Sequence, residues 1–125
     1  MRLEESLDGN HRSDGTRVKG VLNVDFDETL TAEPPRDWTP GAEWPAPDEE
    51  MIRAVTRAWK DGHTIIVWSA RRWVEAPYMV AWLTWHQVPF HAIRLEKGAS
   101  DGYVDDKAIP IGSFLDRYGD DARAA

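Results

Sequence analysis

Residues 21–29 read VLNVDFDET, and this stretch decides the fold class of the chain. It belongs to a mostly apolar, β-branched run from Arg17 to Val24, which is typical of a buried strand. Two carboxylates, Asp25 and Asp27, follow the run directly, and Thr29 comes two positions later. The stretch therefore predicts a strand that ends in an acidic loop.

Further apolar segments alternate with helical patterns along the rest of the chain. Strands are expected at 64–68 (TIIVW), 91–95 (HAIRL) and 103–104 (YV), and helices from the acidic start at 47–50 to Asp61, over 78–86 and over 111–118. This alternation predicts an α/β fold with βαβ units. We expect a doubly wound, mainly parallel sheet with helices on both faces.

The length of 125 residues allows one domain with a real core. We expect a flexible N-terminal tail over 1–16, a single domain over 17–119 and a frayed C-terminus over 120–125. The tail has neither the apolar centre nor the cleavage site of a signal peptide. No apolar run approaches the roughly 18 residues that span a bilayer, so the expected location is the cytoplasm, without a membrane partner.

The charge of the chain excludes several classes of function. The formal net charge is −7, from 22 acidic and 15 basic residues, and this disfavours nucleic acid as a partner. The absence of Cys excludes disulfides and thiolate chemistry. The chain has 13 Asp but only 4 Lys. That bias fits either a halophilic source with a salt-rich cytoplasm or compositional drift in a GC-rich genome.

Most residues with chemical potential follow the carboxyl ends of expected strands. Ser69 follows the second strand, Lys97 the third and the pair Asp105-Asp106 the fourth. Ligands bind at this edge of open α/β sheets, so these side chains and the first acidic loop should converge. Carboxylate oxygens suit Mg²⁺, and a hydroxyl and an ammonium suit phosphoryl oxygens. The set predicts phosphoryl chemistry.

The motifs resemble those of the haloacid dehalogenase-like (HAD) phosphohydrolases. VLNVDFDETLT matches their DxDx[TV] motif, and IIVWS, a lysine and YVDD follow in the family order. The chain is most similar to small capless HAD phosphatases of prokaryotes and phages. Their pattern continues here as Ser69-Ala70-Arg71, Trp82-Leu83 and residues 101–108 (DGYVDDKA). The resemblance covers roughly Val18 to Ile109.

The resemblance implies a role for each matching residue. Asp25 would form an aspartyl-phosphate, and Asp27 would protonate the leaving oxygen and then deprotonate the hydrolytic water. Thr29 would orient Asp27, and Ser69 and Lys97 would hold the phosphoryl oxygens. The resemblance also implies an Mg²⁺ ion, held by the Asp25 carboxylate, the Asp27 backbone carbonyl, Asp105 and Asp106. Glu28 departs from the pattern because glycine is commonest at its position, and Gly98 stands where proline is frequent.

Aromatic and basic residues near the motifs have two interpretations each. Trp38 and Trp44 lie in the Pro-rich excursion 33–47, where they either line the site entrance or pack structurally. Arg71 and Arg72 could bind a second anionic group of a substrate, or form a surface salt bridge or a helix start. The remaining tryptophans with a helical or strand pattern are expected to be core residues or partly buried packing residues: Trp59, Trp68, Trp82 and Trp85.

Other functions compete with the phosphatase interpretation. Receiver domains use similar groups, but they place the acidic pair after the first strand, and here that pair comes last. A non-catalytic module with the same scaffold stays open. Only 42 positions separate Asp27 from Ser69, and 28 separate Ser69 from Lys97, so a cap domain has no room. An open site suits a phosphorylated macromolecule or nucleic-acid end. A small phosphate ester would need a lid, from the excursion or from another copy in a homo-oligomer.

Overall fold

The computed structural model describes residues 10–11, 17–34, 44–96 and 108–122. The expected fourth strand at 103–104 lies outside these ranges. So do Trp38, Lys97, Asp105 and Asp106, together with most of the expected N-terminal tail.

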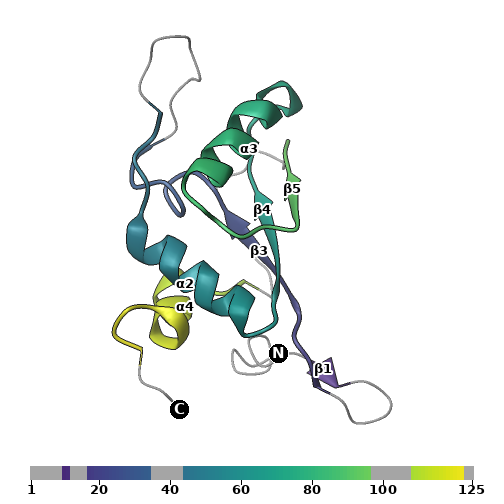
Figure 1. Ribbon diagram of the computed structural model, residues 1–125, viewed down its shortest axis with the longest axis vertical. Coiled ribbons are helices and arrows are strands. Elements are labelled where there is room, and N and C mark those ends of the chain that lie inside the picture. Colours follow the sequence, from purple (N-terminus) through teal and green to yellow (C-terminus); the bar gives the residue numbers. More distant parts are fainter. Residues whose placement is uncertain (1–9, 12–16, 35–43, 97–107, 123–125) are drawn as a thin grey trace.

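A parallel sheet of three strands forms the centre of the described structure (Figure 1). The strands are β3 (Val21–Asp25), β4 (Thr64–Trp68) and β5 (Ala92–Arg94), in the order β3-β4-β5. β3 and β4 pair over their full length, from Val21 opposite Thr64 to Asp25 opposite Trp68. Parallel strands joined by helical crossovers confirm the predicted α/β class.

The sequence predicted one strand over the apolar run from Arg17 to Val24, but the structure divides this run between two strands. Its first two residues form β2 (Arg17–Val18), which pairs antiparallel with β1 (Asn10–His11) inside the expected tail. The chain enters the main sheet only after Gly20. The Gly20 carbonyl accepts bonds from the Thr64 N–H at 3.3 Å and from His63 Nδ1 at 3.1 Å. These bonds start the sheet ladder one residue before β3.

Helix α2 (Glu49–Lys60) confirms the helix expected after the acidic start. The Asp48 carboxylate caps it by accepting the Met51 N–H at 3.0 Å, and two glutamates in its first turn favour the positive end of the helix dipole. The helix ends before Gly62, whose φ of +104° suits glycine. Its buried residues are Met51, Ala54, Val55 and Ala58, and Trp59 is 45% exposed, so of its two expected positions Trp59 does not take the one in the core.

Helix α3 (Ala76–Trp85) follows a short 3-10 turn, η1 (Trp73–Glu75), and starts slightly earlier than predicted. It buries Met79, Trp82 and Leu83. Trp85 was expected in the core or partly buried, but it is 79% exposed, so this expectation is wrong. Because every residue of α3 is uncharged, the sequence offers no polar side from which its outward face could be recognised.

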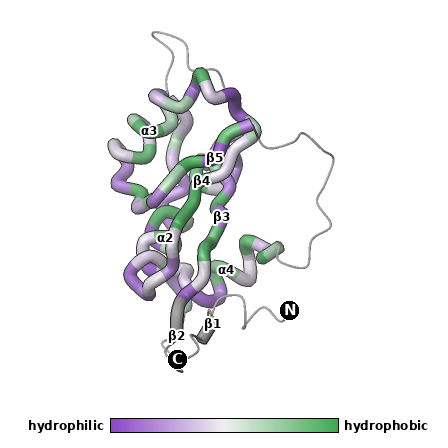
Figure 2. The backbone as a smooth tube through the Cα atoms, turned by 90° about the vertical axis from the view of Figure 1, so that its right-hand side faces the viewer, coloured by the Kyte–Doolittle hydropathy of each residue, from purple (hydrophilic) through white to green (hydrophobic). Residues whose placement is uncertain are grey.

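In the described residues, helices cover one face of the sheet, whereas the sequence predicted helices on both faces. Figure 2 shows α2 and α3 together on one side of the strands. On the other face Val21 and Asn23 of β3 are exposed, and α4 (Ile111–Tyr118) packs against α2 near the lower end of the strands. Two right-handed crossovers between strands that advance in one direction put their helices on the same side. α4 buries Phe114 and Tyr118 and contacts α2. In the described ranges, no helix is long and apolar enough to cross a membrane.

Asp120 was placed in the frayed C-terminus by the sequence interpretation, yet it has defined partners. Its carboxylate accepts bonds from Arg53 and from Arg57 of α2. The Arg57 guanidinium also donates to the Tyr118 carbonyl at 2.9 Å. The domain therefore extends past residue 119, because Asp120, after the end of α4, is hydrogen-bonded to α2.

Candidate active site

The carboxyl ends of β3 and β4 bring three of the expected site residues together, namely Asp25, Asp27 and Ser69. Asp25 is the last residue of β3 and lies opposite Trp68, so Ser69 follows at the same level of the sheet. The ladder continues past the strands, since Phe26 N–H donates to the Trp68 carbonyl at 3.1 Å and Ser69 N–H to the Arg94 carbonyl at 2.9 Å. The structure thus confirms that the first acidic loop and Ser69 share one edge.

Phe26 holds the acidic loop against the hydrophobic core. Its side chain is fully buried and meets the Trp82 ring edge-on, with 5.0 Å between ring centroids. Its carbonyl accepts the N–H groups of Thr29, Leu30 and Thr31 at 2.9 to 3.3 Å. These bonds close a tight turn next to the buried Phe26 ring. The carboxylates Asp25 and Asp27 directly precede and follow Phe26 in the sequence.

Glu28 adopts a left-handed backbone conformation in this turn, with φ of +60°. Its N–H donates to Thr31 Oγ1 at 2.9 Å, and that hydroxyl donates to the Glu33 carbonyl at 3.0 Å. A non-glycine residue is strained in this conformation. The turn geometry gives a physical reason for glycine at this position of the motif, and Thr31 is a supporting residue that the sequence interpretation missed.

Arg71 binds the Asp27 carboxylate through several hydrogen bonds. Its Nη2 donates to Asp27 Oδ1 at 2.8 Å, and its Nε lies 3.2 Å from Oδ1 and 3.1 Å from Oδ2. Side-chain exposure is only 7% for Arg71 and 16% for Asp27. A planar guanidinium that contacts both carboxylate oxygens fixes the orientation of the carboxylate as well as its position.

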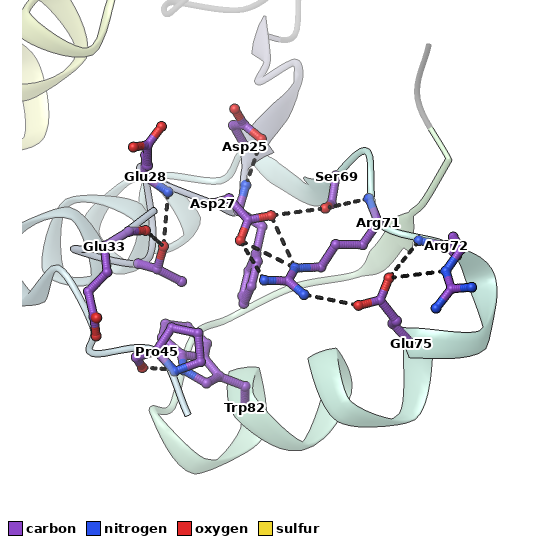
Figure 3. A network of polar contacts seen from close by, with 12 residues as sticks. Asp25, Asp27, Glu28, Glu33, Pro45, Ser69, Arg71, Arg72, Glu75 and Trp82 are labelled. Atoms are coloured by element: carbon purple, nitrogen blue, oxygen red, sulfur yellow. Dashed lines mark hydrogen bonds and ion pairs between the residues drawn. The ribbon is translucent and has the colours of Figure 1, made fainter. Parts of the chain in front are cut away.

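Arg71 is itself held in place by Glu75 and the Phe26 ring. Its Nη1 donates to Glu75 Oε1 at 3.0 Å, and its guanidinium lies 5.8 Å from the centroid of the Phe26 ring. Figure 3 shows Arg71 between Asp27 and Glu75, while the Asp25 carboxylate points away from the guanidinium. The structure shows an ion pair for Arg71, but in a buried position, whereas the sequence interpretation placed such a pair on the surface. Glu75 was missed, although its spacing four residues after Arg71 signals a pair within one turn.

Ser69 completes this group. Its side chain is 1% exposed, accepts the Arg71 N–H at 3.0 Å and directs its hydroxyl toward Asp27 Oδ2 at 3.4 Å. Thr29, which the resemblance assigns to orienting Asp27, is buried and closes the turn through its backbone N–H. Among the described residues, the side-chain bonds to the Asp27 carboxylate come from Ser69 and Arg71.

The loop after β4 is also bonded to the end of β5. Glu96 N–H donates to the Arg71 carbonyl at 2.8 Å, and the Trp73 N–H donates to Glu96 Oε2 at 2.9 Å. Glu96 immediately precedes Lys97, the expected phosphoryl-binding lysine, which lies outside the described residues. The segment leading to Lys97 is therefore bonded to the loop that carries Ser69.

Two further candidates lie at the margin of this group. Arg72 has a highly exposed side chain, with Nε 3.9 Å from Glu75 Oε2, and its N–H donates to the same oxygen at 2.9 Å. It stands at the start of η1, as the alternative interpretation expected. Trp44 is exposed and lies where the Pro-rich excursion returns to the described structure.

Hydrogen bonds join the two ends of the Pro-rich excursion, residues 32–33 and 45–46, which we call its neck. Ala32 N–H donates to the Ala46 carbonyl at 2.8 Å, and the Ala46 N–H donates to Glu33 Oε1 at 2.7 Å. The buried Trp82 indole donates to the Pro45 carbonyl at 2.8 Å. The sequence did not predict that one buried tryptophan would join α3, this neck and Phe26.

The described donors fit the Mg²⁺ ion that the resemblance implies. Asp25, which ends β3, and Asp27, in the loop after it, supply hard oxygen atoms, which Mg²⁺ prefers. Because Arg71 engages the Asp27 carboxylate, the remaining donor of Asp27 is its backbone carbonyl, which is the atom expected to act. The described ranges hold no cluster of three or more candidate ligand side chains. The expected Asp105 and Asp106 lie outside them.

Comparison with solved structures supports the fold. The chain is similar to the crystal structure of a target protein from Vibrio cholerae, with a TM-score of 0.62 and 27% sequence identity. The match covers 76% of this chain and 86% of that chain. No protein-family model and no curated protein matches the chain. The similarity therefore supports the α/β architecture but does not indicate a function, which has to be argued from the chemistry of the site.

Proposed function

We propose that the chain is an Mg²⁺-dependent phosphatase of the HAD type, acting on a phosphate monoester through an aspartyl-phosphate. One observation carries the proposal: Asp25, Asp27 and Ser69 lie at one edge of a parallel sheet, with the Asp27 carboxylate held in one orientation. A nucleophile, an acid/base and a hydroxyl donor at one edge are the parts that phosphoryl transfer to a carboxylate requires.

The chemistry follows from these positions. An Asp25 carboxylate oxygen attacks phosphorus, the ester P–O bond breaks, and the departing oxygen takes a proton from Asp27. In the second step Asp27 accepts a proton from water, whose oxygen attacks phosphorus and releases Asp25 and inorganic phosphate. Ser69 and Lys97 would hold the phosphoryl oxygens. Mg²⁺, when bound by Asp25, the Asp27 carbonyl and the acidic pair Asp105-Asp106, supplies charge neutralisation.

Arg71 enters this proposal as a positioning residue. Its bonds to both oxygens of Asp27 fix the orientation of that carboxylate. A small displacement of a catalytic group costs about 100-fold in rate. The largely buried side chain of Glu75, 16% exposed, holds the guanidinium from its other side.

Release of inorganic phosphate tests the proposal. The full chain is assayed with and without Mg²⁺ on an aryl phosphate, sugar phosphates, nucleotides, phosphopeptides and phosphorylated nucleic-acid ends. We expect Mg²⁺-dependent release that Asp25→Asn abolishes. Asp116→Asn, the same change at an exposed position of α4, serves as the matched control and should retain full activity.

The outcomes separate the competing functions. Activity confined to nucleic-acid ends would assign the macromolecular substrate class. Activity on sugar phosphates or nucleotides would assign a small substrate. A folded wild type that stays inactive on the whole panel would contradict the phosphatase proposal and favour the non-catalytic module.

A further inference from the structure

Helix α3 carries an unusual surface. Its ten residues, APYMVAWLTW, include no charged side chain, whereas charged residues make up 30% of the chain. Only one side of the helix is used by the core, through Met79, Trp82 and Leu83. The other side is uncharged and open to solvent. We call this side, together with η1, the α3 face; its large exposed residues are Trp73, Val74, Tyr78, Val80 and Trp85.

The α3 face is large enough for a stable interface. Trp85 is 79% exposed and Trp73 is 52% exposed. An aromatic side chain carries about 150–250 Å² of surface. With the exposed tyrosine, valines and smaller residues, the face offers roughly 600–800 Å², close to the ~800 Å² that each partner buries in a standard interface. Single exposed apolar residues are ordinary on protein surfaces, but five large ones within thirteen residues, with no charged side chain in α3, indicate an interaction site.

We propose that the α3 face is the interface of a homodimer in which two α3 helices pack antiparallel about a two-fold axis near Ala81. Pro77, Ala81 and Thr84 lie along the middle of the outward side, because residues three and four apart share a helix face. Their small or compact side chains allow close approach of two helices. Bulkier residues stand on the flanks, with Val80 on one and Trp85 and Tyr78 on the other.

The occupant is a second copy because of charge and symmetry. Each chain carries a net charge of −7, so an uncharged face is where two copies meet without direct repulsion. A two-fold axis uses the same patch twice, which requires a self-complementary surface. In antiparallel packing about Ala81, Trp85 of one copy covers the Pro77 region of the other. The exposed Gln87 then faces the Glu75 end of the second copy, which gives a polar rim.

This inference stands independently of the phosphatase proposal, and it also places the interface beside the candidate site. η1 begins directly after Arg72, and Arg71 binds Asp27. The end of α3 in the second copy would therefore lie beside the candidate site.

Sedimentation velocity of the full chain, from micromolar to hundreds of micromolar, measures the association. We expect a dimer, and we expect Ala81→Glu to weaken dimerisation more than about 100-fold, because it buries an unpaired charge at the axis. Trp59→Glu, a charge placed at an exposed tryptophan of α2, should leave the dimer intact. A wild type that is monomeric throughout, or a dimer unaffected by Ala81→Glu, would overturn the proposal.

Cross-linking provides a second test that does not depend on the stability of a charged variant. The chain has no Cys, so a single introduced thiol can only pair with the same thiol of another copy. Ala81→Cys should form a covalent dimer under mild oxidation, and Trp59→Cys should not. Efficient cross-linking at position 59 with none at position 81 would assign the dimer to another face and contradict the proposal.

Discussion

At the scale of single residues, Arg71 is the group on which the candidate site depends. It joins the acid/base candidate Asp27 to Glu75 and lies over the Phe26 ring. The sequence placed Arg71 next to the site but left its partner open, because a basic residue after a strand suits both a substrate anion and an ion pair. Only the fold brings Asp27, 44 positions earlier, within hydrogen-bond distance.

Replacement of Arg71 should lower turnover more than substrate binding. In the proposed phosphatase, Arg71→Ala should reduce kcat by about 100-fold, with KM changed by only a few-fold, since Asp27 loses its orientation. Arg71→Lys should recover little activity, because an ammonium cannot contact both carboxylate oxygens in the same way. Steady-state kinetics measure both effects. Guanidinium added in millimolar amounts should partly restore Arg71→Ala.

The matched control for this prediction is Arg72→Ala. Arg72 is the neighbouring cation, and its side chain is exposed and directed to Glu75. It should change kcat by less than about threefold. Equal losses in both variants, or a loss in Arg71→Ala confined to KM, would contradict the positioning role.

Glu28 gives a prediction about stability. Its φ of +60° strains any residue except glycine, and its side chain is exposed. Glu28→Gly should therefore stabilise the fold by about 0.5–1 kcal/mol, which corresponds to about 2–4 °C in Tm. Glu28→Ala removes the same carboxylate but keeps the strain, so it should not raise Tm. Thermal melts of the three proteins decide the matter, and an equal gain in both variants would point to charge instead of backbone conformation.

At the scale of elements, the contact between α2 and α4 depends on charge. Hydrogen bonds from Arg53 and then Arg57 lower the pKa of Asp120 to about 2. In the same contact, the Tyr118 hydroxyl and Lys19 lower the pKa of Asp61, which follows the end of α2. Both carboxylates are bound by groups from neighbouring elements, so their ionised forms are favoured in the folded chain.

The sign of the pH effect follows from these lowered pKa values. A carboxyl whose pKa is lower in the folded chain adds stability above its ordinary value near 4, and this stability is lost as the pH falls toward the folded value. The Tm of the wild type should therefore fall between about pH 5 and about pH 2.5. The fall should be smaller in Asp120→Asn, which lacks the titrating group. Asp116→Asn, on the exposed side of α4, should follow the wild type, and identical curves for all three proteins would contradict the account.

The elements themselves were largely predictable, and their orientation was not. α2 has a capping Asp48 and a clear apolar period, so both its start and its end could be read from the sequence. In α3, Trp82 and Trp85 are equally apolar, and only packing against Phe26 and the neck at Pro45 decides that Trp82 is buried. A helix without a polar side carries no signal of its outward face. Likewise, nothing in Glu28 itself indicates a positive φ.

At the scale of the whole molecule, the acidic surface is a separate property from the site. The net charge of −7 causes self-repulsion that dissolved salt screens. If the Asp-rich, Lys-poor composition is an adaptation to a salt-rich cytoplasm, Tm should rise by several degrees between low and molar KCl. The melts are repeated in Asp120→Asn, where the salt-sensitive ion pairs to α2 are absent. A flat or falling Tm in both proteins would leave compositional drift as the explanation.

The architecture as a whole also explains why the candidate site could be located from sequence. Parallel strands end at one edge, so residues that follow β3 and β4 must come close together whatever the loops between them do. This reasoning brought Asp25, Asp27 and Ser69 together correctly. It could not supply Glu75 and Thr31, which act through loop geometry, or the hydrogen bonds of Arg71.

The most direct test of the central claim is to trap the covalent intermediate. The full chain is mixed with Mg²⁺ and an aryl phosphate carrying labelled phosphorus, quenched in acid, and analysed for protein-bound label that hydroxylamine releases. We predict a labelled protein whose modified peptide contains Asp25, no label in Asp25→Asn, and normal labelling in Asp116→Asn. Phosphate release without a trapped intermediate in the wild type, or label retained in Asp25→Asn, would contradict Asp25 as the nucleophile.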